Sequence, residues 1–333
     1  KQTGYSLGAE NSQNVIIGNL AAANLVVIPS GQTNMKNLIV GKECAYSIDD
    51  GVNNVMIGDS ILYSGASGNN PSSDVLIGNN VSYNSSNSYN NTYIGHDVGY
   101  GNMGTENVLI GRESGRNTVD ANRNVLIGMK SGYQSSEGDQ NIYIGNEAGY
   151  SVNNTNGSFN IGFGNRIGYN MSNSGDKNIL FGGKTTDGIN GTQDSVGYAI
   201  TSGSNNIIFG IISGNAITTG TDNILFGGES GKNITTGRDN LFIGSNAGST
   251  MSDKYDNIFI GSNTGTINTK WDNIFIGHEA GRLNIATRNL AIGFRSGYLV
   301  DGDNNIFFGQ SSGGNVNGNR ITGTSNNMLG YRS

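Results

Sequence analysis

Cysteine, proline and charged residues are all scarce in this sequence. It has one cysteine, two prolines and 13% charged residues among 333 positions. One cysteine cannot form an intrachain disulfide, so burial, backbone pairing or association between chains must stabilise the fold. The net charge of -6, with no run of Lys and Arg, argues against nucleic-acid binding. No apolar run approaches the roughly 18 residues of a membrane span, so we expect no membrane insertion.

Glycine, in contrast, is abundant, with 54 residues that mark an internal repeat. A Gly-X-Y period is absent, which excludes collagen. Each repeat contains Asn, three mostly apolar residues and a glycine that we call the anchor glycine, as in N-I-F-I-G at 257–261 and 273–277. The 18 anchors are Gly18, Gly41, Gly58, Gly78, Gly95, Gly111, Gly128, Gly145, Gly164, Gly182, Gly210, Gly227, Gly244, Gly261, Gly277, Gly293, Gly309 and Gly330. Of the 17 intervals between them, 11 are 16 or 17 residues long.

The apolar triplet before each anchor predicts a short strand. Alternate side chains of a strand point to opposite faces, so the first and third residues share one face and the middle residue lies on the other. We expect the first and third residues to fill the coil and the middle residues to form an exposed stripe, too large for a soluble monomer. The stripe then predicts a homotrimer interface. Its expected residues are Leu109, Leu126, Tyr143, Phe242, Phe259, Phe275 and Phe307.

A second glycine follows most anchors in the pattern G-x-x-small-G, where it allows a sharp turn and a close approach of coils. The unit therefore predicts an all-β fold, a parallel β-solenoid of about 18 coils with repeats of 16–17 residues, assembled as an intertwined or side-by-side homotrimeric fibre. We expect one repeat domain over 1–333, with a lead-in at 1–13, solenoid repeats at 14–330 and the longest inserted loop at 183–205. The Asn before each triplet predicts a ladder of amides between coils.

The unit N-[V/I/L]-x-[I/F]-G-x-x-[A/S]-G resembles the repeats of trimeric autotransporter adhesin heads, and more closely the N-x-x-I-G-x-x-A-G repeats of phage tail fibres and large surface proteins. Its best matches are N-I-Y-I-G-N-E-A-G-Y (141–150) and N-I-F-I-G-H-E-A-G-R (273–282). The resemblance implies a trimeric parallel β-solenoid with a receptor-binding or stalk role. Within residues 1–333 we expect neither the heptad coiled-coil stalk nor the C-terminal membrane anchor of the adhesins.

No pattern in the sequence favours catalysis or metal binding. Glu43, Glu113, Glu147, Glu229 and Glu279 recur two residues after an anchor, which predicts a column of ion pairs rather than a unique catalytic pair. Cys44 occupies the slot that Ala, Ser or Thr fills in other repeats, so we expect it to pack in the interior. We therefore predict no enzymatic activity, no catalytic residue, no metal and no cofactor.

Exposed aromatic residues are the best candidates for ligand contact, because an aromatic face with polar neighbours suits sugar rings. Lys254-Tyr255 and Lys270-Trp271 occupy the same slot in successive coils, which predicts one patch. A second candidate is a column of Tyr133, Tyr150 and Tyr169, each directly after a second glycine. Structural stacking along the coil is the alternative explanation for both.

Together these features predict a structural fibre or adhesin that presents multivalent contacts to a cell-surface glycan or protein receptor of a host. We expect part of a phage tail fibre, located in the virion or at an extracellular or cell surface, with other fibre or virion proteins as partners. A passive stalk or spacer of a bacterial surface adhesin is one alternative. A tailspike-like polysaccharide depolymerase is another.

Overall fold

The protein is a parallel β-solenoid, all-β throughout the residues that its computed structural model describes. These are residues 13–22, 36–46, 51–63, 71–84, 88–101, 104–136, 138–150, 154–155, 157–171, 175–183, 195–267, 269–314 and 320–333, and none of them is helical. The chain divides into two compact units, Lys1–Asn160 and Ile161–Ser333, where the sequence predicts one repeat domain. The same repeat builds both units, so no change of pattern marks the boundary.

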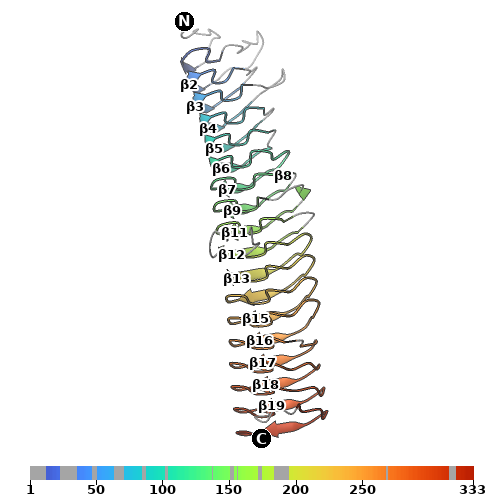
Figure 1. The fold of residues 1–333 in the computed structure, drawn as a ribbon. Helices are drawn as coiled ribbons and strands as arrows, with labels where there is room; N and C mark the ends of the chain where they lie inside the picture. Colours follow the sequence, from blue (N-terminus) through green and yellow to red (C-terminus); the bar gives the residue numbers. More distant parts are fainter. Residues whose placement is uncertain are drawn as a thin grey trace, which may run out of the picture. The chain divides into compact units, whose positions relative to one another are not determined.

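Unit 1 stacks one short strand from each repeat in sequence order (Figure 1). Its main strands are β1 (Val15–Ile17), β2 (Leu38–Lys42), β3 (Val55–Asp59), β4 (Val75–Asn79), β5 (Thr92–His96), β6 (Val108–Arg112), β7 (Val125–Ile127) and β9 (Ile142–Ile144). A separate parallel pair joins β8 (Ser135–Ser136) to β10 (Asn154–Thr155).

Unit 2 has the same arrangement within itself, formed by strands from the later repeats. They are β11 (Ile161–Phe163), β12 (Ile179–Gly183), β13 (Ile207–Ile211), β14 (Ile224–Phe226), β15 (Leu241–Ile243), β16 (Ile258–Ile260), β17 (Ile274–Ile276), β18 (Leu290–Ile292), β19 (Ile306–Phe308) and β20 (Asn327–Leu329). Within each unit every pairing is parallel and aligns equivalent repeat positions; Phe242, for example, lies between Leu225 and Phe259. Each type of side chain therefore forms a column.

The side chains of each apolar triplet point the opposite way from the prediction. The middle residues point into the coil: Leu109, Phe242, Phe259, Phe275 and Phe307 are fully buried, and Leu126 and Tyr143 are nearly so. The first and third residues point outward and are half-buried or exposed. Assignment of the middle residues to a trimer interface is therefore wrong, because these side chains form the core of a single chain and are not available at its surface.

The coil interior is narrow, which explains why only the middle residue of each triplet points inward. The ring of Phe242 packs against the backbone of the second glycine, Gly248, where a Cβ atom would lie 2.3 Å from the ring. Small residues such as Ala247, together with Met251 on the returning segment, fill the remaining space. One large side chain per strand is enough to occupy this interior, so two would overpack it.

The anchor glycines hold neighbouring coils at close distance. Gly58 has φ +147°, and a Cβ atom there would lie 1.7 Å from the carbonyl oxygen of Gly78 in the next coil. This contact excludes every other residue type at the position.

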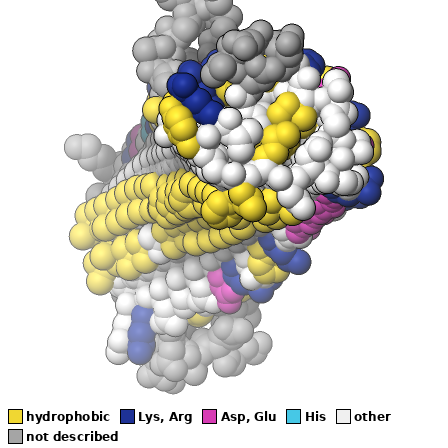
Figure 2. Space-filling model, turned by 90° about the horizontal axis from the view of Figure 1, so that it is seen from below, with side chains coloured by type: hydrophobic (Ala, Val, Ile, Leu, Met, Phe, Trp, Pro, Cys, Tyr) yellow, Lys and Arg dark blue, Asp and Glu magenta, His cyan; other side chains and the backbone are white. Residues whose placement is uncertain are grey.

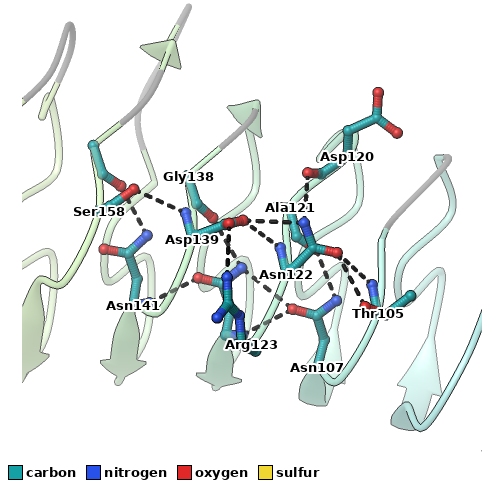
Figure 3. A network of polar contacts seen from close by, with 12 residues as sticks. Thr105, Asn107, Asp120, Ala121, Asn122, Arg123, Gly138, Asp139, Asn141 and Ser158 are labelled. Atoms are coloured by element: carbon teal, nitrogen blue, oxygen red, sulfur yellow. Dashed lines mark hydrogen bonds and ion pairs between the residues drawn. The ribbon is translucent and has the colours of Figure 1, made fainter.

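The predicted asparagine ladder is present. Asn54 donates to Asn37 Oδ1 from its backbone nitrogen at 2.9 Å and from Nδ2 at 3.0 Å, and Nδ2 also donates to the carbonyl of Pro71. Figure 3 shows the same row at Asn107 and Asn141, with a second polar row through Asn122 beside it. Because these amides are buried, their mutual hydrogen bonds satisfy groups that would otherwise be costly to bury.

The predicted segments outside the strands are only partly described. Residues 1–12 of the lead-in and residues 184–194 of the longest loop lie outside the described residues. Residues 195–205 of that predicted loop belong to the coil instead, since Val196 and Ile200 are fully buried and Gly197 has the φ of a second glycine, +56°. The sequence D-S-V-G-Y at 194–198 carries this signal, because it matches the turn that follows other anchors.

Candidate binding surfaces

The outward-facing first and third residues form two apolar columns on the sheet of each unit, which we call the apolar face. In unit 2 the side chains of Phe226, Ile243, Ile274 and Phe308 are 38–50% exposed. The triplets contain no charged residue at either position anywhere in the chain. Figure 2 shows rows of hydrophobic side chains on the surface. The apolar stripe predicted from the sequence therefore exists, but other residues form it.

Stacked phenyl rings reinforce part of the apolar face in unit 2. Phe163, Phe181, Phe209 and Phe226 follow one another in the third column, with ring centroids 4.9, 4.6 and 4.4 Å apart. Near-parallel stacking at such distances gives a stiff aromatic surface. This surface is suited to another apolar surface rather than to a charged ligand.

The structure brings Tyr255 and Trp271 together as predicted, with ring centroids 5.7 Å apart and planes inclined by 9°. Arg238 extends the row by one turn, because its guanidinium lies 5.0 Å from the centre of the Tyr255 ring. Sequence reasoning missed Arg238, although it occupies the same slot in the preceding repeat, six residues before Gly244. The resulting row has one cation and two aromatic rings.

The two predicted lysines have different surroundings. The Lys254 side chain is 26% exposed and forms an ion pair with Asp253, whose pKa this hydrogen bond lowers. Lys270 is exposed. The pKa of Asp303 is lowered first by a hydrogen bond from the Thr287 backbone and to a smaller extent by the charge of Lys270. Lys270 is thus the more accessible of the two cations.

The tyrosine column is longer than predicted. In unit 1 Tyr133 stacks on Tyr150 at 5.1 Å, and Arg116 lies between this pair and Tyr100. Further stacking precedes Tyr100 in the same column, through Tyr46, Tyr63 and Tyr83. In unit 2 Tyr169 stacks on Tyr198 at 5.5 Å. Tyr198 is buried and the other rings are half-buried, so the column stabilises the coil edge and its half-buried members present ring edges and hydroxyls to solvent.

The glutamate column forms ion pairs, as expected. Glu113 contacts Arg116 at 3.9 Å and Glu229 contacts Lys232 at 3.3 Å, each three residues away. Glu279 is 6% exposed and pairs with both Arg282 and Arg295. Burial alone raises its pKa, but the hydrogen bond and charge of Arg295 and the charge of Arg282 outweigh burial, so the pKa is lowered overall.

The single cysteine and the potential metal ligands are the remaining candidate groups. Cys44 is fully buried as predicted, and burial raises the pKa of its thiol to about 12, which suppresses the reactive thiolate. Among the described residues no three His, Cys, Asp or Glu side chains are placed to hold a metal ion. The same residues include no helix that could cross a membrane.

The sequence was compared with protein families and with curated proteins. No protein-family model matches the chain, and no curated protein sequence matches it either. Its function must therefore be argued from the surfaces themselves.

Proposed function

We propose that the chain is a non-enzymatic fibre or adhesin segment that assembles as a homotrimer through its apolar face and displays repeated contacts to a cell-surface receptor. Part of a phage tail fibre is the context that its repeat favours. The apolar face is the observation that carries this proposal.

The size of the apolar face supports assembly. An aromatic or large aliphatic side chain that is about two-fifths exposed leaves on the order of 50–100 Å² in contact with water. Unit 2 has two outward-facing residues in each of its ten strands, some this exposed and the others half-buried, so its apolar face exposes on the order of 1,000 Å². A standard interface buries about 800 Å² on each partner, whereas the largest apolar patch of a typical monomer covers about 300–600 Å².

The chemistry of the apolar face favours another copy of the same chain as its partner. No charge interrupts the two columns, so identical faces do not repel one another. The columns repeat at the strand spacing, about 4.8 Å, so a second copy can match the same period along its whole length. A closed cyclic arrangement buries every copy of the face and leaves no free apolar edge.

Assembly also explains how weak surface contacts could give firm attachment. The row of Arg238, Tyr255 and Trp271 lies outside the named strands, three residues before β15, β16 and β17, and none of the three belongs to the apolar face, so assembly through that face does not use them. Three chains would present each contact three times, and linked contacts raise the apparent affinity well above that of one site. This is the proposed mechanism of receptor attachment.

The first experiment measures the mass of the native particle by light scattering. We expect three times the chain mass of 34.9 kDa. Ile243→Lys combined with Ile274→Lys places charge in both columns of the apolar face and should give a monomer. Ser202→Lys combined with Thr236→Lys is the matched control, because it adds the same charge at two exposed loop residues and should leave the trimer intact. A monomeric wild-type chain, or a double variant that remains trimeric, refutes assembly through this face.

A further inference from the structure

A cavity of about 310 Å³ opens at the corner of the last turns of unit 2. Phe294, Arg295 and Tyr298 from the turn after β18 form one wall, and Arg332 lies two repeats further on at the position equivalent to Arg295. Ser311 and Gly314 belong to the intervening turn. The volume is at the lower end of the range for small-molecule sites, which is suited to one sugar unit.

The cavity exists because the intervening turn has small side chains where its neighbours have large ones. Gly314 occupies the slot that holds Tyr298 one turn earlier, so one side of that ring has no stacked neighbour from this turn. A Cβ atom at Gly314 would lie 2.7 Å from the carbonyl oxygen of Arg295, so the backbone favours glycine. Ser311 likewise takes the slot of Arg295 and Arg332, leaving a gap of two strand spacings, about 10 Å, between the two arginines.

The charged residues that line the cavity are all positive. None of its lining residues is acidic, and two are arginines. Glu279 outside the cavity holds Arg295 through Nε, which fixes the guanidinium 5.6 Å from the Tyr298 ring centre and 5.2 Å from that of Phe294. Arg332 forms no ion pair within the described part of the chain, and its guanidinium lies 5.0 Å from the centre of the Tyr331 ring. One arginine is thus positioned in advance and the other is available for a ligand.

We propose that this cavity binds a sugar that carries a carboxylate, such as a uronic acid unit of an acidic glycan. The guanidinium groups match a carboxylate, which they can bind through two parallel hydrogen bonds. The open face of Tyr298 supplies the flat surface on which a pyranose ring packs. A neutral sugar lacks the first interaction and a simple carboxylate lacks the second. This proposal rests on the proposed receptor-binding role, since it names the class of glycan.

The test is calorimetric titration of the whole chain with glucuronate at low ionic strength, with glucose and acetate as comparison ligands. We expect glucuronate to bind at least ten-fold more tightly than either. Ser311→Glu should weaken glucuronate binding at least ten-fold, because the new carboxylate occupies the gap between the arginines. Its backbone suits glutamate: Ser311 has φ +56° and Glu279, in the same slot, has φ +57°.

Arg332→Gln should cause a similar loss, whereas Arg112→Gln removes an exposed arginine from unit 1 and should have no effect. Equal binding of glucuronate to the wild-type chain and Ser311→Glu overturns the proposal, as does equal affinity for glucuronate and acetate. Native mass is measured on the same samples. A trimer that does not bind glucuronate refutes the sugar site and leaves the fibre proposal intact. A monomer that binds glucuronate supports the sugar site and refutes the trimeric fibre.

Discussion

Replacing Asp74 by asparagine should stabilise the protein at neutral pH. Asp74 is fully buried and occupies the asparagine position of its repeat. Its carboxylate accepts hydrogen bonds from the Asn91 backbone at 2.8 Å and from Ser88 Oγ at 2.7 Å. An ionised carboxylate cannot donate to Asn54 Oδ1, as an amide would, so Asp74 interrupts the side-chain part of the ladder.

The magnitude follows from the pKa of this group. Burial raises the pKa of Asp74 from 3.8 to about 6, against the lowering effect of the hydrogen bonds from Ser88 and Asn91. Because the pKa of Asp74 is raised in the folded state, the contribution of this group to the free energy of unfolding is present at low pH and is lost as the pH rises from about 4 through 6. A rise of this size in the pKa corresponds to a loss of about 3 kcal/mol in the free energy of unfolding, at about 1.4 kcal/mol for each pKa unit.

Urea denaturation of the wild-type chain and Asp74→Asn between about pH 4 and pH 8 tests this reasoning. The advantage of the variant should be small at pH 4 and should grow to about 3 kcal/mol above pH 7. Asp239→Asn, at an exposed aspartate, is the control and should show no such growth. A difference that does not change with pH, or a variant that is less stable at pH 8, would show that Asp74 is not an ionisable defect in the ladder.

Two further predictions concern the coil contact and the aromatic row. Gly58→Ala should destabilise the fold by on the order of 3 kcal/mol or more in urea denaturation, because its Cβ would overlap the carbonyl of Gly78. Gly228→Ala has open space within 4 Å and should be nearly neutral; equal losses would contradict the close-contact argument. Tyr255→Ala with Trp271→Ala should abolish attachment to glycan-bearing cells while native mass stays unchanged, and unchanged attachment would rule this row out as the receptor contact.

The sequence predicts most of the solenoid because its repeat is a direct copy of the structural period. The positions of the strands, their parallel register and the asparagine ladder all follow from residues such as Asn54 and Gly58 that recur at the same place in each unit. Alternation along a strand also shows which residues share a face. These properties depend on spacing alone, and spacing is visible in one sequence.

The face of each strand that points into the coil could not be predicted in the same way. Alternation groups Ile258 with Ile260 against Phe259, but it does not say which group faces inward. The decision depends on the interior volume, which is set by the backbone of glycines such as Gly265 against the Phe259 ring. The cavity at Arg332 was missed for a related reason: it arises from small side chains at Ser311 and Gly314, and only stacking of three turns reveals the gap.

The asparagine ladder makes the length of the solenoid adjustable. Asn206 donates to Asn178 Oδ1 at 3.0 and 3.1 Å across an interval of 28 residues, as Asn223 donates to Asn206 at 2.9 and 3.2 Å across 17. Each asparagine of the ladder therefore bonds to the asparagine of the preceding repeat in the same way, whatever the length of the chain between them. Duplication or loss of a whole repeat preserves the hydrogen bonds between successive asparagines. Recombination within such a gene can therefore change the length of the solenoid in steps of one strand spacing while its core packing stays the same.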